Sequence, residues 1–326
     1  MKTQYSFLQN TWACALALVA VLAVRFNRND YFFANPGPFD SKNYISFIHY
    51  FRGEPFDVTH IGNSIRWRPL GPWLASWLPF EPMTALNVLN AILLGLAVWS
   101  LSALLIKLLV PTNERWKGIY LFIFSFPMLY YGSIGYVDPV LMGFMGLALL
   151  ALYQDQWQLL VSCFVLATLA KEGSIVLLPV IATYMYFRKP FWQTICITLG
   201  FLVTYIVLEW AMRQYMPNPS GRVNALIWKS SWEFIFYNAA RWKWWVGTLL
   251  TSLPLLYLLV RFRHNLLAIR ANKSVLLPLV VGFFAAGSTW IYQLFSSYSD
   301  GRPLWAMYPF LIPLVVILNS PKRASL

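Results

Sequence analysis

The chain has 326 residues, of which 59% are apolar and only 11% are charged. Soluble domains carry roughly 25% charged residues, so this composition excludes a water-soluble globular protein and requires lipid as the main solvent. The net charge of +13 comes from basic residues that lie between apolar runs, which is typical of membrane proteins and does not favour nucleic acid as a partner.

Uncharged stretches divide the chain into candidate membrane spans. A perpendicular span needs about 20 residues. The ten stretches are residues 3–24, 82–106, 118–137, 139–154, 156–170, 173–187, 190–208, 244–260, 274–299 and 303–321. Three of them, starting at Pro139, Gln156 and Gly173, have only 15 or 16 residues, and we expect these short helices to border a water-filled cavity. The sequence predicts an all-α polytopic membrane protein with about 10 transmembrane helices, in a single domain over residues 1–326.

Charge distribution predicts how the spans are oriented. With the N- and C-termini in the cytoplasm, the short inside turns are basic, as the positive-inside rule requires. These inside turns carry Lys107, Arg115, Lys117, Arg188, Lys189, Arg261, Arg263, Arg270, Lys273, Lys322 and Arg323. Ten of the twelve acidic residues then fall on the outer side, all except Glu114 and Asp155. We therefore expect the active site to be extracytoplasmic.

The first long outer loop covers residues 25–81 and is expected to contain amphipathic helices. Apolar residues at positions 44, 45, 47, 48 and 51 share one helical face, and Asp40 precedes them where a helix N-cap is placed. A second aromatic stretch, residues 69–80, is too short to span and is expected to lie in the interface. Arg66 and Arg68 come directly before it.

Four motifs, in order, resemble the GT-C superfamily of membrane glycosyltransferases, which use polyprenyl-phosphate-linked sugars and include aminoarabinose transferase and protein O-mannosyltransferase. The first joins Asp40, Tyr44 and the stretch Arg68-Pro-Leu-Gly-Pro-Trp-Leu-Ala. The others are Tyr136-Val-Asp-Pro, Ala167-Thr-Leu-Ala-Lys-Glu-Gly, and Arg302 ahead of Tyr308-Pro-Phe-Leu. The first loop has one acid where many relatives carry two, and the chain is shorter than many of them, so their substrates are not carried over.

The resemblance implies a GT-C-like fold and an inverting transfer of a sugar from a polyprenyl-phosphate carrier to an extracytoplasmic acceptor. It implies that Asp40 is the general base, which removes a proton from the acceptor hydroxyl. Cations suit the leaving phosphate because guanidinium groups hold two phosphate oxygens at once. The candidate phosphate ligands are Arg66, Arg68, Lys171 and Arg302, and the candidate sugar or acceptor contacts are Tyr44, Asp138 and Glu172.

All of these residues except Tyr44 also have an ordinary structural interpretation. Asp40 is suited to be a plain N-cap, and Asp138 precedes a proline at a helix start, where an N-cap is also expected. Lys171 and Glu172 are adjacent and are able to pair with each other. The arginines before residue 69 are suited to bind lipid headgroups, and Arg302 to cap the last span.

The sequence assigns neither a metal nor another cofactor, although the outer acids leave a weakly bound divalent metal open. Glu54, Asp57 and His60 are close together, but their spacing is specific to no ion. The three cysteines, Cys14, Cys163 and Cys196, lie inside apolar stretches and fit neither a metal site nor a disulfide framework.

The second long outer loop, residues 209–243, interleaves tryptophans with basic residues, which favours an interfacial helix among anionic headgroups. The partners expected for the whole chain are membrane lipid, the lipid-linked sugar donor, and a glycan, lipid or protein acceptor. A bacterial inner membrane is the expected location. Three alternative functions stay open: a transporter or flippase for lipid-linked saccharides, a polysaccharide polymerase or acyltransferase, and a noncatalytic scaffold. A transporter is expected to show matching halves with broken helices, and no such halves are visible.

Overall fold

A computed structural model of the chain describes residues 2–26, 39–56, 67–216, 231–262, 273–296 and 301–320. All regular structure in these residues is helical, and they contain no strand. This agrees with the prediction of an all-α protein from the apolar composition.

The first half of the chain supplies the centre of a helical bundle. Its helices are α1 (Lys2–Phe26), α2 (Phe39–Arg52), α4 (Leu70–Ser76), α5 (Pro82–Lys107), α6 (Thr112–Ile123), α7 (Phe126–Tyr130), the 3₁₀ helix η2 (Tyr131–Ser133) and α8 (Asp138–Tyr153). Helix α5 packs between α1 and α8 with close backbone approaches. A Cβ at Gly143 of α8 would lie 2.9 Å from the Leu93 carbonyl oxygen of α5, so only glycine permits this contact.

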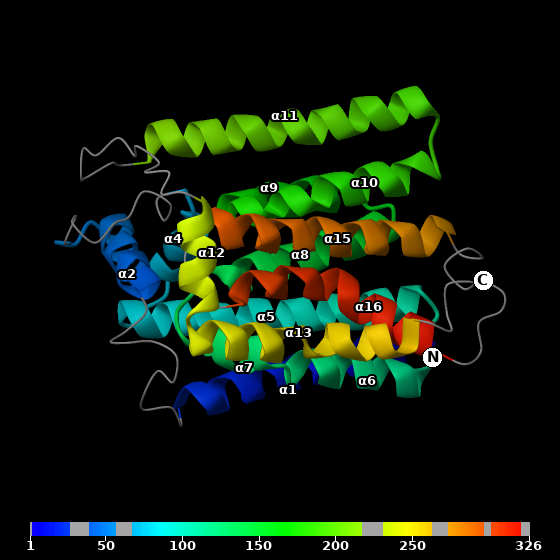
Figure 1. Cartoon of the computed structure of the whole chain (residues 1–326), viewed down its shortest axis with the longest axis horizontal. Helices are drawn as coiled ribbons and strands as arrows, with labels where there is room; N and C mark the ends of the chain where they lie inside the picture. The colour runs from blue at the N-terminus through cyan, green and yellow to red at the C-terminus, as the bar shows by residue number, and fades with distance from the viewer. Residues whose placement is uncertain are drawn as a thin grey trace.

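The second half wraps around that centre. Its helices are α9 (Trp157–Ala170), η3 (Glu172–Val176), α10 (Leu177–Tyr186), α11 (Phe191–Tyr215), α12 (Ser231–Ala239), α13 (Trp242–Phe262), α15 (Lys273–Ser296), η4 (Arg302–Met307) and α16 (Tyr308–Asn319). The long helices run along a common axis, whereas α2 and α12 lie across one end of the bundle (Figure 1). Helix α11 lies at the edge of the bundle, and only 17% of its most apolar part is buried inside the protein.

Among the described residues, four helices are long and apolar enough to cross a membrane: Pro82–Lys107, Phe191–Tyr215, Lys273–Phe295 and Arg302–Asn319. The apolar surface that they expose fits a lipid environment, as Val203 and Ile206 of α11 illustrate with exposed fractions of 56% and 54%. The protein is thus a helical membrane protein, as its composition indicates.

The short stretches of the sequence are short helices in the structure. Helix α8 has 16 residues and α9 has 14, which at about 1.5 Å per residue is roughly 24 and 21 Å. The hydrocarbon core of a bilayer is about 30 Å thick, so their charged ends cannot both reach the two interfaces. The turn before Asp138 is recessed relative to the start of α5, because Asn90, the ninth residue of α5, bonds to the Tyr136 carbonyl. Lys171, just after Ala170, lies at the same level because it pairs with Asp138.

The amphipathic helix expected in the first loop is present as α2. Tyr44, Phe47 and Ile48 of its apolar face are at most 1% exposed, and Tyr44 and Ile48 share a hydrophobic cluster with Leu70 and Ala75 of α4 and with residues of α5. Helix α11 continues to Tyr215, beyond the predicted end of its span at residue 208. The pair between Glu209 and Arg213, four residues apart and 3.4 Å from each other, accommodates these charges within the helix.

Candidate functional site

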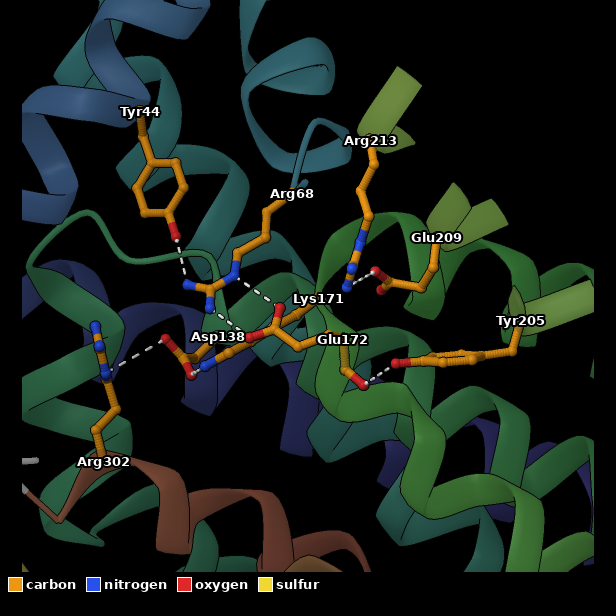
Figure 2. Close-up of polar contacts among 9 residues, drawn as sticks. All are labelled: Tyr44, Arg68, Asp138, Lys171, Glu172, Tyr205, Glu209, Arg213 and Arg302. Atoms are coloured by element: carbon orange, nitrogen blue, oxygen red, sulfur yellow. Dashed lines mark hydrogen bonds and ion pairs between the residues drawn. The ribbon is translucent and has the colours of Figure 1, made fainter. Parts of the chain in front are cut away.

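A polar cluster lies where α8 begins and α9 ends, at the end of the bundle that α2 and α4 cover (Figures 1 and 2). Lys171 follows the last residue of α9 in an extended conformation, with φ −169° and ψ 143°. This breaks the helix, so that Glu172 starts a new 3₁₀ turn and the two adjacent side chains take different directions. Two charges thus enter the cluster from one turn.

Lys171 forms a buried ion pair with Asp138. The Lys171 Nζ and Asp138 Oδ1 atoms are 2.6 Å apart, and both side chains are 8% exposed. The N-cap position of α8 is taken by Val137, and Asp138 is the first residue of the helix itself. The N-cap interpretation of Asp138 is therefore wrong, and its carboxylate serves the ion pair instead.

Arg302 reaches the same carboxylate from the other side. Its Nε lies 3.8 Å from Asp138 Oδ2, and its guanidinium carbon lies 3.9 Å from the centre of the Tyr136 ring. The preceding residue, Gly301, has φ 84° and lies against the backbone of Thr248 in α13, which directs the chain from there into η4. The Tyr136 carbonyl accepts a 2.7 Å hydrogen bond from Asn90 of α5, so α5 positions the segment that carries both Tyr136 and Asp138.

Arg68 and Glu172 form a second, bidentate pair. Arg68 Nε donates to Glu172 Oε2 at 2.9 Å, a second guanidinium nitrogen donates to Oε1, and a third lies 3.3 Å from the Tyr44 hydroxyl. Burial alone would lower the pKa of the Arg68 guanidinium, but the Glu172 carboxylate raises this pKa well above its usual value. Lys171 and Glu172 thus pair with separate partners and not with each other, so that structural interpretation is wrong.

Helix α11 closes one side of the cluster. The Tyr205 hydroxyl donates to the Glu172 carbonyl at 3.2 Å (Figure 2). The Arg213 guanidinium lies 4.4 Å from the centre of the Trp67 ring. Because the rest of α11 is largely exposed, these contacts tie its end to the cluster.

Six of the predicted site residues therefore lie in one cluster, although they come from distant parts of the sequence: Tyr44, Arg68, Asp138, Lys171, Glu172 and Arg302. Arg66 lies outside the described residues. Asp40 lies in the first turn of α2, and its side chain lies outside the described part. The next residue, Ser41, lies close to Gly135: a Cβ atom added at Gly135 would be 3.4 Å from the Cβ atom of Ser41. The backbone at Asp40 is thus near the segment that leads into Asp138.

The charges of the cluster favour an anionic ligand. Arg68, Lys171 and Arg302 are opposed by Asp138 and Glu172, which leaves one net positive charge in a partly buried site. Among the described residues, no group of three or more His, Cys, Asp or Glu side chains is arranged to hold a metal ion. Near α2, His49 pairs with Glu54 at 2.6 Å.

The prediction from sequence did not assign Asn90, Tyr136 or Tyr205 to the site. Tyr136 belongs to a motif that sequence reading does single out. Asn87 and Asn90 stand out in an otherwise apolar span, where polar residues are costly and are usually functional. Tyr205 carries no comparable signal, because aromatic residues are frequent throughout the spans.

The chain matches no protein-family model, no curated protein and no solved structure.

Proposed function

We propose that this protein is a GT-C-like inverting glycosyltransferase that moves a sugar from a polyprenyl-phosphate carrier to an extracytoplasmic acceptor. The observation that carries the proposal is the convergence of Arg68, Lys171 and Arg302 at one end of a membrane-type helical bundle. Three cations in a recessed site suit a phosphate monoester or diester that is attached to a lipid.

The proposed topology has ten spans, with both termini in the cytoplasm. Besides the four long helices, the shorter apolar helices that include Leu8–Val24, Asp138–Tyr153, Trp157–Ala170, Glu172–Tyr186 and Trp245–Tyr257 contribute spans. The tenth span consists of α6 and α7 together. In this topology the cluster lies on the extracytoplasmic side of the membrane. In a bacterium, this membrane is the inner membrane.

The proposed chemistry is a single displacement. The acceptor hydroxyl attacks the anomeric carbon, the bond from this carbon to the phosphate oxygen breaks, and the polyprenyl phosphate leaves with the bonding electrons. Asp40 takes the proton of the acceptor hydroxyl, and the three cations stabilise the charge that develops on the phosphate. Tyr44, one turn after Asp40 in α2, contacts Arg68 and thereby links the base to the phosphate site.

The experiment is sugar transfer by purified protein from a panel of radiolabelled polyprenyl-phosphate sugars, comparing the wild type with Asp40→Asn. We expect wild-type turnover and a loss of about 10²–10⁴-fold in the variant, the contribution typical of a general base. Asp155→Asn is the matched control, because Asp155 pairs with Arg188 in the turns at the opposite end of the bundle.

Each outcome separates part of the proposal. Turnover that survives in Asp40→Asn keeps the enzyme class and removes Asp40 as the base. Binding of the donor without any transfer across the panel contradicts the enzyme and favours a transporter of the lipid-linked saccharide.

A further inference from the structure

Helix α5 carries a stripe of side chains that faces the segment between α7 and α8. Met83 lies against Gly135, Asn90 donates to the Tyr136 carbonyl, and Leu94 lies against Gly132. Positions 83, 87, 90 and 94 share one helical face, so Asn87 lies between these contacts and faces the same segment. At about 1.5 Å per residue, Asn87 is roughly 6 Å along the helix from Met83.

Three side chains around this segment have buried polar atoms without partners. Asn87 is 5% exposed, and within the described part of the chain neither its amide nitrogen nor its oxygen has a hydrogen-bond partner. Asn90 is fully buried, and its oxygen likewise has no partner there. The third side chain is Trp305, which packs against Tyr131 and lies near Gly132. Its buried ring nitrogen has no hydrogen-bond partner in the described part of the chain.

Unpaired groups of this kind are costly and uncommon. More than about 90% of buried polar groups in proteins have a partner, and a buried group without one costs about 1–3 kcal/mol. Leucine at position 87 would avoid this cost in an otherwise apolar helix. The unpaired groups of Asn87 and Asn90 therefore indicate a ligand with complementary hydrogen-bonding groups.

The chemistry of the stripe identifies the class of ligand. The unpaired groups of Asn87 offer donors and an acceptor together, and Asn90 adds a further acceptor. A hydroxyl group is itself both donor and acceptor, and neighbouring hydroxyls of a sugar ring match a primary amide at two points. The stripe carries no charge, so it suits a neutral polyhydroxyl group and not the phosphate that the cationic cluster suits.

The stripe is connected to the cationic cluster. Asn90 holds the Tyr136 carbonyl, the Tyr136 ring stacks with Arg302, and Arg302 reaches Asp138. Toward the end of the bundle, Met83 is half-buried, and its flexible thioether and Ser41, in the first turn of α2, both lie against Gly135. The stripe therefore begins beside the first turn of α2, which carries Asp40.

We infer that Asn87 and Asn90 form a subsite that hydrogen-bonds the hydroxyl groups of a carbohydrate. This inference rests on the proposed function, because the sugar on the lipid phosphate is the carbohydrate that the neighbouring cationic cluster would bring to it.

The test compares two ligands that differ only by the sugar. Purified protein in lipid nanodiscs is titrated with undecaprenyl phosphate and with a panel of undecaprenyl-phosphate-linked hexoses and pentoses. We expect one of the linked sugars to bind the wild type more tightly than the bare phosphate. Asn87→Leu is expected to bind bare undecaprenyl phosphate like the wild type and to lose about five- to tenfold in affinity for that linked sugar, the loss of one or two hydrogen bonds.

Stability provides an independent readout. Because Asn87→Leu removes an unpaired amide, the thermal unfolding midpoint of the variant without ligand is expected to rise while sugar affinity falls. Ser100→Ala is the matched control in α5, since the buried Ser100 hydroxyl bonds to its own helix backbone at Leu96 and its side chain faces Gly146 of α8. We expect this control to change neither affinity.

The outcomes distinguish this subsite from the proposed function. If undecaprenyl phosphate binds the wild type and Arg68→Ala equally well, the proposed phosphate site fails. If the phosphate site holds but Asn87→Leu keeps its full affinity for the linked sugar, the subsite is wrong, and a rise in stability alone then indicates that Asn87 contacts water only. A wild type that gains nothing from any linked sugar also overturns the inference.

Discussion

The ion pair of Lys171 and Asp138 is the most deeply buried charge interaction among the described residues, with each side chain 8% exposed. Removing one partner of a buried pair leaves a charge without compensation, which costs about 3–5 kcal/mol. We therefore expect Lys171→Met to lower the thermal unfolding midpoint strongly. The double variant Lys171→Met/Asp138→Asn removes both charges and is expected to recover about half of that loss. Equal instability of the single and double variants would show that the pair itself does not determine stability.

The Glu172 carboxylate accepts two hydrogen bonds from the Arg68 guanidinium. A phosphate that binds Arg68 needs the same donors. An anionic ligand must compete with this carboxylate, which is 38% exposed and therefore partly screened by solvent. Glu172→Gln keeps the shape and removes the charge. Because pairs of this exposure contribute about 1 kcal/mol at most, we expect undecaprenyl phosphate to bind up to about fivefold more tightly.

The control for this effect is Glu114→Gln, which removes a carboxylate from an exposed pair with Lys117 in α6. Titration in nanodiscs measures both variants. Weaker binding to Glu172→Gln would contradict competition and would instead show that Glu172 holds Arg68 in the orientation that binds the phosphate.

At the scale of elements, η4 depends on the glycine that precedes it. Gly301 has φ 84°, and a Cβ there would lie 2.5 Å from the Thr248 backbone nitrogen of α13. Gly53, after α2, has φ 68° and has nothing within 4 Å of such a Cβ. We expect Gly53→Ala to cost about 1–2 kcal/mol from backbone strain alone. Gly301→Ala is expected to cost about 1–3 kcal/mol more, because η4 must move away from α13.

Thermal unfolding measures both costs, and sugar transfer measures the displacement of Arg302 at the start of η4. We expect transfer to fall in Gly301→Ala and to persist in Gly53→Ala. The same loss of stability in the two variants would show that the backbone at Thr248 moves away from the added methyl group at no further cost in stability.

Helix α2 is held in place by one arginine at its end. The Arg52 guanidinium donates to the carbonyls of Ser76, Leu78 and Phe80, at 3.3, 2.9 and 2.7 Å. Charged hydrogen bonds contribute about 1.5–3 kcal/mol each, so Arg52→Met is expected to destabilise the protein and loosen α2 from the segment before α5.

Because α2 carries Asp40 and Tyr44, kcat is expected to fall in Arg52→Met, although the hydrogen bonds of Arg52 run to the segment before α5. Partial recovery in Arg52→Lys is expected, since an ammonium group still reaches part of the carbonyl set. Unchanged kcat in a destabilised Arg52→Met would limit the residue to a purely structural role.

At the scale of the whole molecule, uncharged stretches predict where helices lie because membrane helices tolerate charge poorly. The shortness of α8 and α9 is visible in the sequence for this reason, as are the charged turns at their ends. The partners of the charges are not visible. Arg68 and Glu172 are 104 positions apart, and only the packing of α2, α4 and α9 brings them together. The N-cap interpretation of Asp138 fails for the same reason, since local sequence contains no information on Lys171.

The cluster at one end of the bundle gives the protein two distinguishable faces. Glu54 is half-exposed just after α2, and Lys117 is exposed in the first half of α6. Helix α6 begins at the opposite end of the bundle, where the turns from α5 to α6 and from α10 to α11 lie (Figure 1). After replacement of the three cysteines, single cysteines are introduced as Glu54→Cys or Lys117→Cys. The basic turns are expected to face the cytoplasm, so a membrane-impermeant maleimide should label Glu54→Cys in intact cells and Lys117→Cys only after permeabilisation. The reverse pattern would place the cationic cluster in the cytoplasm, where an extracytoplasmic acceptor has no access to it.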